Sequence, residues 1–194
     1  MFVKATGFFG ILTVLFFIFS SCSDDNSMKK NENKYYFNES EFLKAKANWN
    51  SYSMKNYSFD YSISDVKPNS IRGRVSVLNG IGSVDLTVSG LTKDDDLFDS
   101  ECLRYKALGK KIEFINIDEI FEFIEELVKK RKIQTETEEL SYYKMDIKYN
   151  EKHIPASISE TILEVENSNS PKIDGDWHDE FYMKIFNFSE NLDD

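Results

Sequence analysis

The densest cluster of side chains that could bind a cation or transfer a proton is the segment 174–180, Asp-Gly-Asp-Trp-His-Asp-Glu. Its candidate metal ligands are Asp174, Asp176, His178 and Asp179. Carboxylate oxygens suit hard cations, but the spacing does not match an EF-hand, because the required third ligand and the bidentate glutamate are missing. Zinc would need more histidine or cysteine ligands, and the only other histidine is His153. The pattern favours an acidic loop, and we expect no metal and no cofactor.

Cys102 is the second candidate group, a nucleophile if His153 or His178 lies beside it. No local signature supports this dyad, since the chain lacks a glycine-rich phosphate loop, a nucleophile elbow and a metalloprotease motif. Cys102 is otherwise a small buried hydrophobic residue or a free thiol. The sequence therefore identifies no catalytic residue.

The composition limits the classes of protein to which the chain can belong. It has 194 residues, of which 41% are hydrophobic and 14% aromatic, enough for the core of about one domain. The 34 acidic residues outnumber the 24 basic ones, and the pI is near 4.8. We expect no nucleic-acid partner, because a phosphate backbone requires a basic face.

The first 21 residues have the layout of a secretory signal peptide. Lys4 is the only charge, and residues 8–19 are apolar apart from Gly10 and Thr13. This run is shorter than the roughly 20 residues that span a bilayer. The segment Phe19-Ser20-Ser21-Cys22 resembles the bacterial lipobox, whose cysteine is lipidated and becomes the first residue. The alternatives are an uncleaved anchor and a soluble exported protein cleaved near Ser21.

Lipidation of Cys22 would have two consequences. It leaves Cys102 without a partner for a disulfide within the chain. The remaining 23 basic and 34 acidic side chains give a net charge of −11, so attachment to the membrane would depend on the acyl chains. Residues 22–36 are polar and predict a flexible tether. Ser23-Asp24-Asp25 resembles the acidic signal that sends some lipoproteins of Bacteroidota to the cell surface, so we expect the envelope, and the outer membrane or cell surface rather than the inner membrane.

Two capping boxes predict the main helices. Asn38 to Glu41 precedes an apolar stripe that continues to about residue 53, with Phe37 and Phe42 placed as a hydrophobic staple. A second capping box at 116–119 opens a helix that the basic run 129–132 is expected to close, where it would complement the helix dipole. A docking role for this run is the alternative.

Alternating patterns predict the strands between and after these helices. They cover 57–63, a hairpin with an Asn79-Gly80 turn between 75–77 and 84–88, and strands at 145–149, 155–165 and 180–188. The order lacks regular βαβ alternation. We therefore predict one α+β domain over residues 37–190, an antiparallel β-sheet with two main helices packed on one face.

The chain also resembles a family of uncharacterised bacterial lipoproteins with a domain of unknown function. The resemblance runs over most of residues 42–188 and rests on short motifs in a fixed order. These are Trp49 with Tyr57-Ser58-Phe59, Val75-Ser76-Val77 with Asn79-Gly80, Ile117 to Phe121, Tyr149 with Pro155 to Ile158, and a terminal acidic and aromatic strand. It implies an envelope lipoprotein with a small α+β domain, and it supplies no catalytic residue.

These observations favour a non-catalytic binding or structural module of the bacterial envelope. Its expected partners are the membrane, through the lipid on Cys22, and an envelope protein or polysaccharide. Two alternatives stay open. One is a hydrolase that uses the 174–180 loop with a metal, or Cys102. The other is a small-molecule binder that uses the aromatic face of the sheet.

Overall fold

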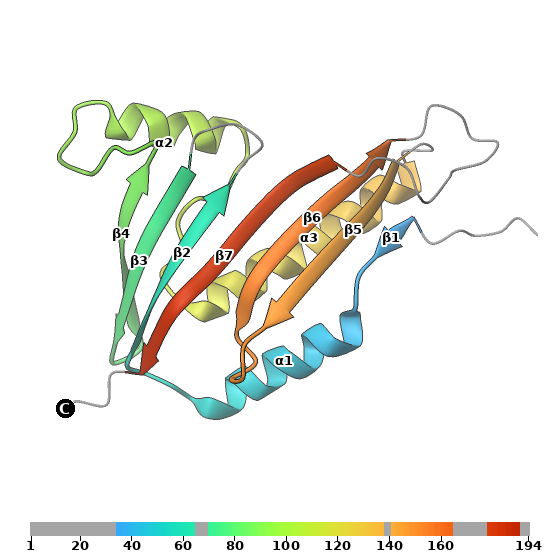
Figure 1. Ribbon diagram of the computed structural model, residues 1–194, viewed down its shortest axis with the longest axis horizontal. Coiled ribbons are helices and arrows are strands. Elements are labelled where there is room, and N and C mark those ends of the chain that lie inside the picture. Colours follow the sequence, from blue (N-terminus) through green and yellow to red (C-terminus); the bar gives the residue numbers. More distant parts are fainter. Residues whose placement is uncertain (1–33, 65–69, 138–140, 165–177, 191–194) are drawn as a thin grey trace, which may run out of the picture. The chain divides into compact units, whose positions relative to one another are not determined.

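Seven strands form one sheet, in the order β1-β5-β6-β7-β2-β3-β4 (Figure 1). The computed structural model describes residues 34–64, 70–137, 141–164 and 178–190. The strands are β1 (Tyr35–Tyr36), β2 (Tyr57–Ser64), β3 (Ser70–Leu78), β4 (Ile81–Val88), β5 (Ser141–Tyr149), β6 (Pro155–Glu164) and β7 (His178–Glu190). The helices are α1 (Glu39–Tyr52), α2 (Phe98–Ala107) and α3 (Ile117–Thr137). The predicted α+β class is confirmed.

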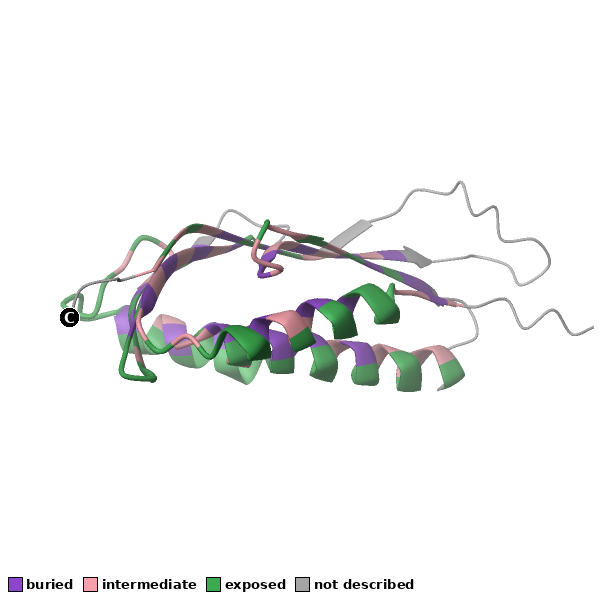
Figure 2. Ribbon diagram, turned by 90° about the horizontal axis from the view of Figure 1, so that it is seen from below, coloured by how far each residue is buried: buried purple, intermediate pink, exposed green. Residues whose placement is uncertain are grey.

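The helices α1 and α3 lie on one face of the sheet, as predicted (Figure 2). The local chemistry of α1 is also as predicted: the Asn38 side chain accepts a hydrogen bond from the backbone N–H of Glu41 at 3.2 Å. The rings of Phe37 and Phe42 lie 5.5 Å apart, which fixes the angle at which the chain enters the helix. The Trp49 indole N–H donates to the Asp118 carboxylate at 2.8 Å and ties α1 to α3.

The aromatic side chains of β2 form the centre of the core. Tyr57, Phe59 and Tyr61 are at most 2% exposed. The Tyr61 hydroxyl donates to the carbonyl of Ile112 at 2.9 Å, and it accepts from the N–H of Phe114. Gly73 on β3 makes room for this ring, since a Cβ there would lie 2.2 Å from a Tyr61 ring carbon.

The sheet is mixed, not wholly antiparallel, because β1 pairs with β5 in parallel. Tyr35 and Tyr36 were predicted to end the flexible tether, and the structure corrects this boundary. The reason is burial, because Tyr35 is 6% exposed and its hydroxyl contacts the sulfur of Met145 at 3.9 Å. Two adjacent tyrosines supply apolar area that a polar tether lacks.

The basic run 129–132 does not close α3, because the helix continues to Thr137. One member of the run instead turns toward the sheet. The Arg131 guanidinium binds both carboxylate oxygens of Glu160, at 2.8 and 2.7 Å, and it lies 4.6 Å from the centre of the Tyr143 ring. Glu160 is 1% exposed, so this ion pair is part of the core.

Candidate binding site

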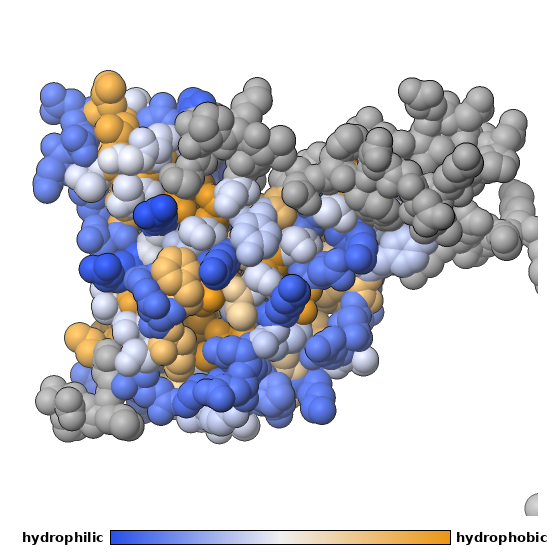
Figure 3. All heavy atoms as spheres, viewed as in Figure 1, coloured by the Kyte–Doolittle hydropathy of each residue, from blue (hydrophilic) through white to orange (hydrophobic). Residues whose placement is uncertain are grey.

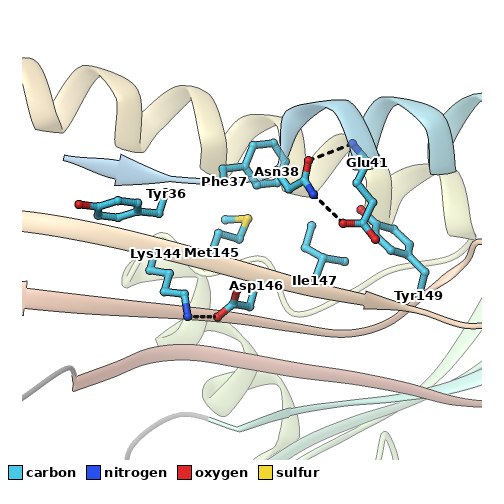
Figure 4. A pocket seen from close by; sticks show the side chains of 9 residues that line it. All are labelled: Tyr36, Phe37, Asn38, Glu41, Lys144, Met145, Asp146, Ile147 and Tyr149. Atoms are coloured by element: carbon cyan, nitrogen blue, oxygen red, sulfur yellow. Dashed lines mark hydrogen bonds and ion pairs between the residues drawn. The ribbon is translucent and has the colours of Figure 1, made fainter. Parts of the chain in front are cut away.

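A pocket of about 270 Å³ opens where the chain leaves β1 to begin α1 (Figure 4). Its lining residues come from two segments that are far apart in sequence. They are Tyr36, Phe37, Asn38 and Glu41 on one side, and Lys144, Met145, Asp146, Ile147 and Tyr149 of β5 on the other. The pocket therefore lies along an edge of the sheet.

The pocket exists because β1 is much shorter than β5. The parallel pairing covers Tyr35 with Tyr143 and Tyr36 with Lys144, and it includes a 2.8 Å hydrogen bond from the Tyr143 N–H to the Lys34 carbonyl. The chain then turns into α1 at Asn38, whose side chain caps the helix. Along 145–149, β5 has no neighbouring strand on this side within the part of the chain that the structure describes.

The free edge of β5 presents backbone groups that can pair with another strand. Backbone groups of successive residues in a strand point alternately to its two neighbours. Because the Tyr143 N–H points to β1, those of Met145 and Ile147 point to the same side. The pairing of Tyr36 with Lys144 uses the Met145 N–H. Neither the Met145 carbonyl nor the N–H and carbonyl of Ile147 bonds to any residue in the described ranges.

The pocket has an apolar inner wall and a polar outer rim. The side chains of Phe37, Met145 and Ile147 lie on the side that faces α1 (Figure 4). Lys144 and Asp146 alternate with them, point to the other side of the strand, and form an ion pair of 2.8 Å. An extended ligand on this edge would meet apolar side chains on one face and a neutralised pair on the other.

Glu41, an exposed residue of α1, places a carboxylate at the edge of the pocket. One of its oxygens accepts a hydrogen bond from the Asn38 side-chain amide at 2.8 Å. Tyr149 lies beside Glu41 in Figure 4, and burial, together with the negative charge of Glu41, raises the pKa of the Tyr149 hydroxyl. Like any tyrosine, Tyr149 is protonated at neutral pH, and this shift keeps it so at higher pH. Among the residues whose side chains are described, none forms an ion pair with Glu41.

The opposite edge of the sheet is β4, and side chains and a turn protect it. The Lys93 ammonium donates to the Val84 carbonyl at 3.2 Å. Val88 and Leu91 exchange two backbone hydrogen bonds of 2.9 Å, which covers the end of the strand. Such devices keep an edge from pairing with other chains. These contacts cover the Val84 carbonyl and the Val88 end of β4, whereas the open stretch of β5 has a pocket beside it.

The candidate metal ligands predicted from the sequence lie mostly outside the described residues. Asp174 and Asp176 fall there, as do Cys22 and the rest of the proposed tether up to residue 33. Of His178 and Asp179 the structure describes the backbone, which begins β7 opposite Ile162 and Thr161. Among the described residues, no three or more aspartate, glutamate, histidine or cysteine side chains lie close enough together to hold a metal ion.

Cys102 and His153 do not form a dyad. Cys102 is buried in α2, and burial raises the pKa of its thiol, which lowers the fraction of nucleophilic thiolate at neutral pH. His153 lies in the turn between β5 and β6. Figure 1 shows α2 and this turn at opposite ends of the strands. The pair that a cysteine hydrolase would need is therefore not assembled from these two residues.

The aromatic face of the sheet is its buried face. Tyr57, Phe59 and Tyr61 point toward the helices, while the alternate residues of β2 are polar and face outward. Figure 3 shows this outer face, on which hydrophobic residues form small groups among hydrophilic ones. The aromatic residues that line the pocket belong to other segments: Tyr36, Phe37 and Tyr149. This site was not predicted from the sequence, in which the adjacent Tyr35-Tyr36-Phe37 before a capping box is the available signal.

Comparisons of the chain with protein-family models, with curated proteins and with solved structures give no match. Within the described ranges, no helix has both the length and the apolar composition needed to cross a membrane.

Proposed function

We propose that this chain is a non-catalytic binding module that takes up an extended segment of another protein as an additional strand on β5. The observation that carries the proposal is the coincidence of an open strand edge with a pocket. Strand addition draws its affinity from main-chain hydrogen bonds and its specificity from pockets for alternate side chains. Open backbone groups and a pocket for side chains both occur between Met145 and Tyr149.

The bound segment would continue the line of β1, between β5 and the start of α1. The Met145 carbonyl and the N–H and carbonyl of Ile147 provide the hydrogen-bonding groups. Alternate side chains of the segment would point toward Phe37 and Ile147, and the others toward the Lys144–Asp146 pair. A pocket of about 270 Å³ has room for one or two side chains, which suits a peptide better than a large ligand.

We further propose that the module is held at the bacterial envelope by lipid on Cys22. The support is the apolar run at 8–19 with the lipobox-like segment 19–22, followed by polar residues that fit a tether. An outer-membrane or cell-surface position agrees with the acidic start of that tether. A binding module on a tether can search for partners that are themselves attached to the envelope.

A small molecule is the second candidate ligand, because the pocket combines apolar and polar groups within a small volume. The two candidates differ in their use of the backbone. A peptide strand needs the outward N–H of Ile147, whereas a small molecule that fills the pocket depends chiefly on the side chains. Two variants of Ile147 that both shorten its side chain, one with the N–H and one without it, separate them.

Replacement of Ile147 by proline should weaken peptide binding by roughly tenfold or more, because it removes the N–H that the added strand uses. Proline is tolerated on edge strands when its nitrogen faces away from the sheet. Ile147→Ala is the matched control, since it shortens the same side chain but keeps the N–H. Peptides of about ten residues, selected from a displayed random library against the mature chain, provide the probe, and calorimetry measures their affinity.

Two results would contradict peptide-strand binding. Either the library yields no binder, or Ile147→Pro and Ile147→Ala bind the selected peptide equally well. Thermal melting of each variant is the control that tests whether it is folded. As a second measurement, replacing the peptide amide that donates to the Ile147 carbonyl with an ester should weaken binding to the unaltered chain as well.

A further inference from the structure

We infer that the bound segment presents a lysine or arginine side chain to Glu41, so that the site selects basic extended peptides. The inference rests on the proposed strand addition and adds the chemistry of the residue that enters the pocket. It follows from the charge balance around the pocket and from the shape of its inner wall.

The carboxylates around the pocket differ in their partners. Asp146 is neutralised by Lys144 at 2.8 Å, and Glu39, at the start of α1, lies 3.3 Å from the Lys132 ammonium. Glu41 has the Asn38 amide as its side-chain partner but no basic side chain within the described part of the chain. Of the carboxylates that line the pocket, Glu41 is thus the one that a ligand can neutralise.

The surroundings of Glu41 match the two parts of a basic side chain. Phe37 and Ile147 provide apolar surface for the aliphatic stem, and Glu41 lies at the end of that surface nearest Tyr149 (Figure 4). Lysine and arginine commonly pack their stems on apolar surface while their charged heads reach a polar group. The Tyr149 hydroxyl, which remains protonated, offers its oxygen as a further acceptor. The net charge of −10 also favours the approach of a basic segment.

A peptide selected from the library and carrying a basic residue at the inward position tests this inference. Glu41→Gln should weaken its binding roughly fivefold, the expected effect of one partly exposed charge pair. Replacing the basic residue by norleucine should weaken binding to the unaltered chain by a similar factor, and Glu41→Gln should then have no further effect. Glu39→Gln is the matched control, because it removes a charge from the same helical turn outside the pocket. Higher salt should reduce the difference between the basic and norleucine peptides.

The outcomes separate this inference from the proposed function. If Ile147→Pro abolishes binding while Glu41→Gln binds basic peptides normally, the preference for basic residues is wrong and strand addition stands. Selection of peptides without a basic residue at alternate positions would also overturn the inference. If neither substitution affects binding, both proposals are wrong. A dimer that forms through the β5 edge and excludes the peptides would equally contradict a peptide partner, and sedimentation detects it.

Discussion

Replacing Cys22 with serine is expected to move the protein from the membrane fraction to the soluble fraction of the cell. Each buried CH₂ of an acyl chain contributes about 0.8 kcal/mol to membrane attachment, and stable anchoring takes two or more chains. Without them, a chain with net charge −11 has no electrostatic attraction to anionic lipid that could replace the anchor. Fractionation of cells followed by immunoblotting measures the distribution.

Cys102→Ala is the control for this experiment, because Cys102 is buried in α2 and cannot be the lipidated residue. It should leave the protein in the membrane fraction. If the Cys22→Ser protein still sediments with membranes, the proposed lipid anchor is wrong, and an uncleaved apolar segment would be the remaining explanation for attachment.

Replacing Arg131 with methionine should lower the free energy of unfolding by about 3–5 kcal/mol, the usual cost of leaving one partner of a buried ion pair alone. The Glu160 carboxylate accepts two hydrogen bonds from Arg131 and is 1% exposed, so it would be left buried without its cation. The substitution also removes the cation from the Tyr143 ring. Denaturation by urea measures the change.

Two further variants make this prediction specific. Lys132→Met breaks the exposed pair with Glu39 and should change stability by less than about 1 kcal/mol. The double variant Arg131→Met with Glu160→Met should recover much of the loss, because no uncompensated charge remains in the core. Equal destabilisation by Arg131→Met and Lys132→Met would show that the pair contributes no more than a surface contact.

The parts of the fold that were predictable have their causes close together in sequence. The capping boxes at Asn38 and Asn116 formed the expected hydrogen bonds to the backbone N–H groups of Glu41 and Glu119. The Asn79-Gly80 turn has positive φ at both residues, as a tight hairpin turn requires. Apolar residues at every second position predicted the strands after α1, and apolar residues at every third or fourth position predicted α1 and α3.

The features that were missed depend on contacts between distant segments. β1 is two residues long, and its pairing with β5 cannot be inferred from a local pattern. α2 has an ordinary helical spacing of buried residues at Phe98, Cys102 and Tyr105, but the acidic residues around it obscured the pattern. Arg131 was grouped with its basic neighbours, because nothing in that run distinguishes the residue that meets Glu160.

The candidate site was missed for the same reason. Sequence reasoning looked for side chains that carry chemistry, and it selected the 174–180 segment and Cys102. The β5 edge is defined instead by an absence of pairing beyond Tyr36 among the residues that the structure describes, where the capping of α1 by Asn38 takes the chain out of the sheet. Whether a strand has a neighbour is a property of the topology, and residue types alone do not report it.

Hydrogen exchange at the Ile147 amide, followed by NMR, reports whether the β5 edge is open and whether a peptide pairs with it. In the free protein this N–H should exchange rapidly, whereas those of Asp146 and Lys148, which point to β6, should be protected. Addition of a peptide selected from the library should slow exchange at Ile147 to the range of its two neighbours, because the added strand accepts its hydrogen bond. Full protection of Ile147 in the free protein would contradict an open edge, and unchanged rapid exchange in the peptide-saturated protein would contradict strand addition.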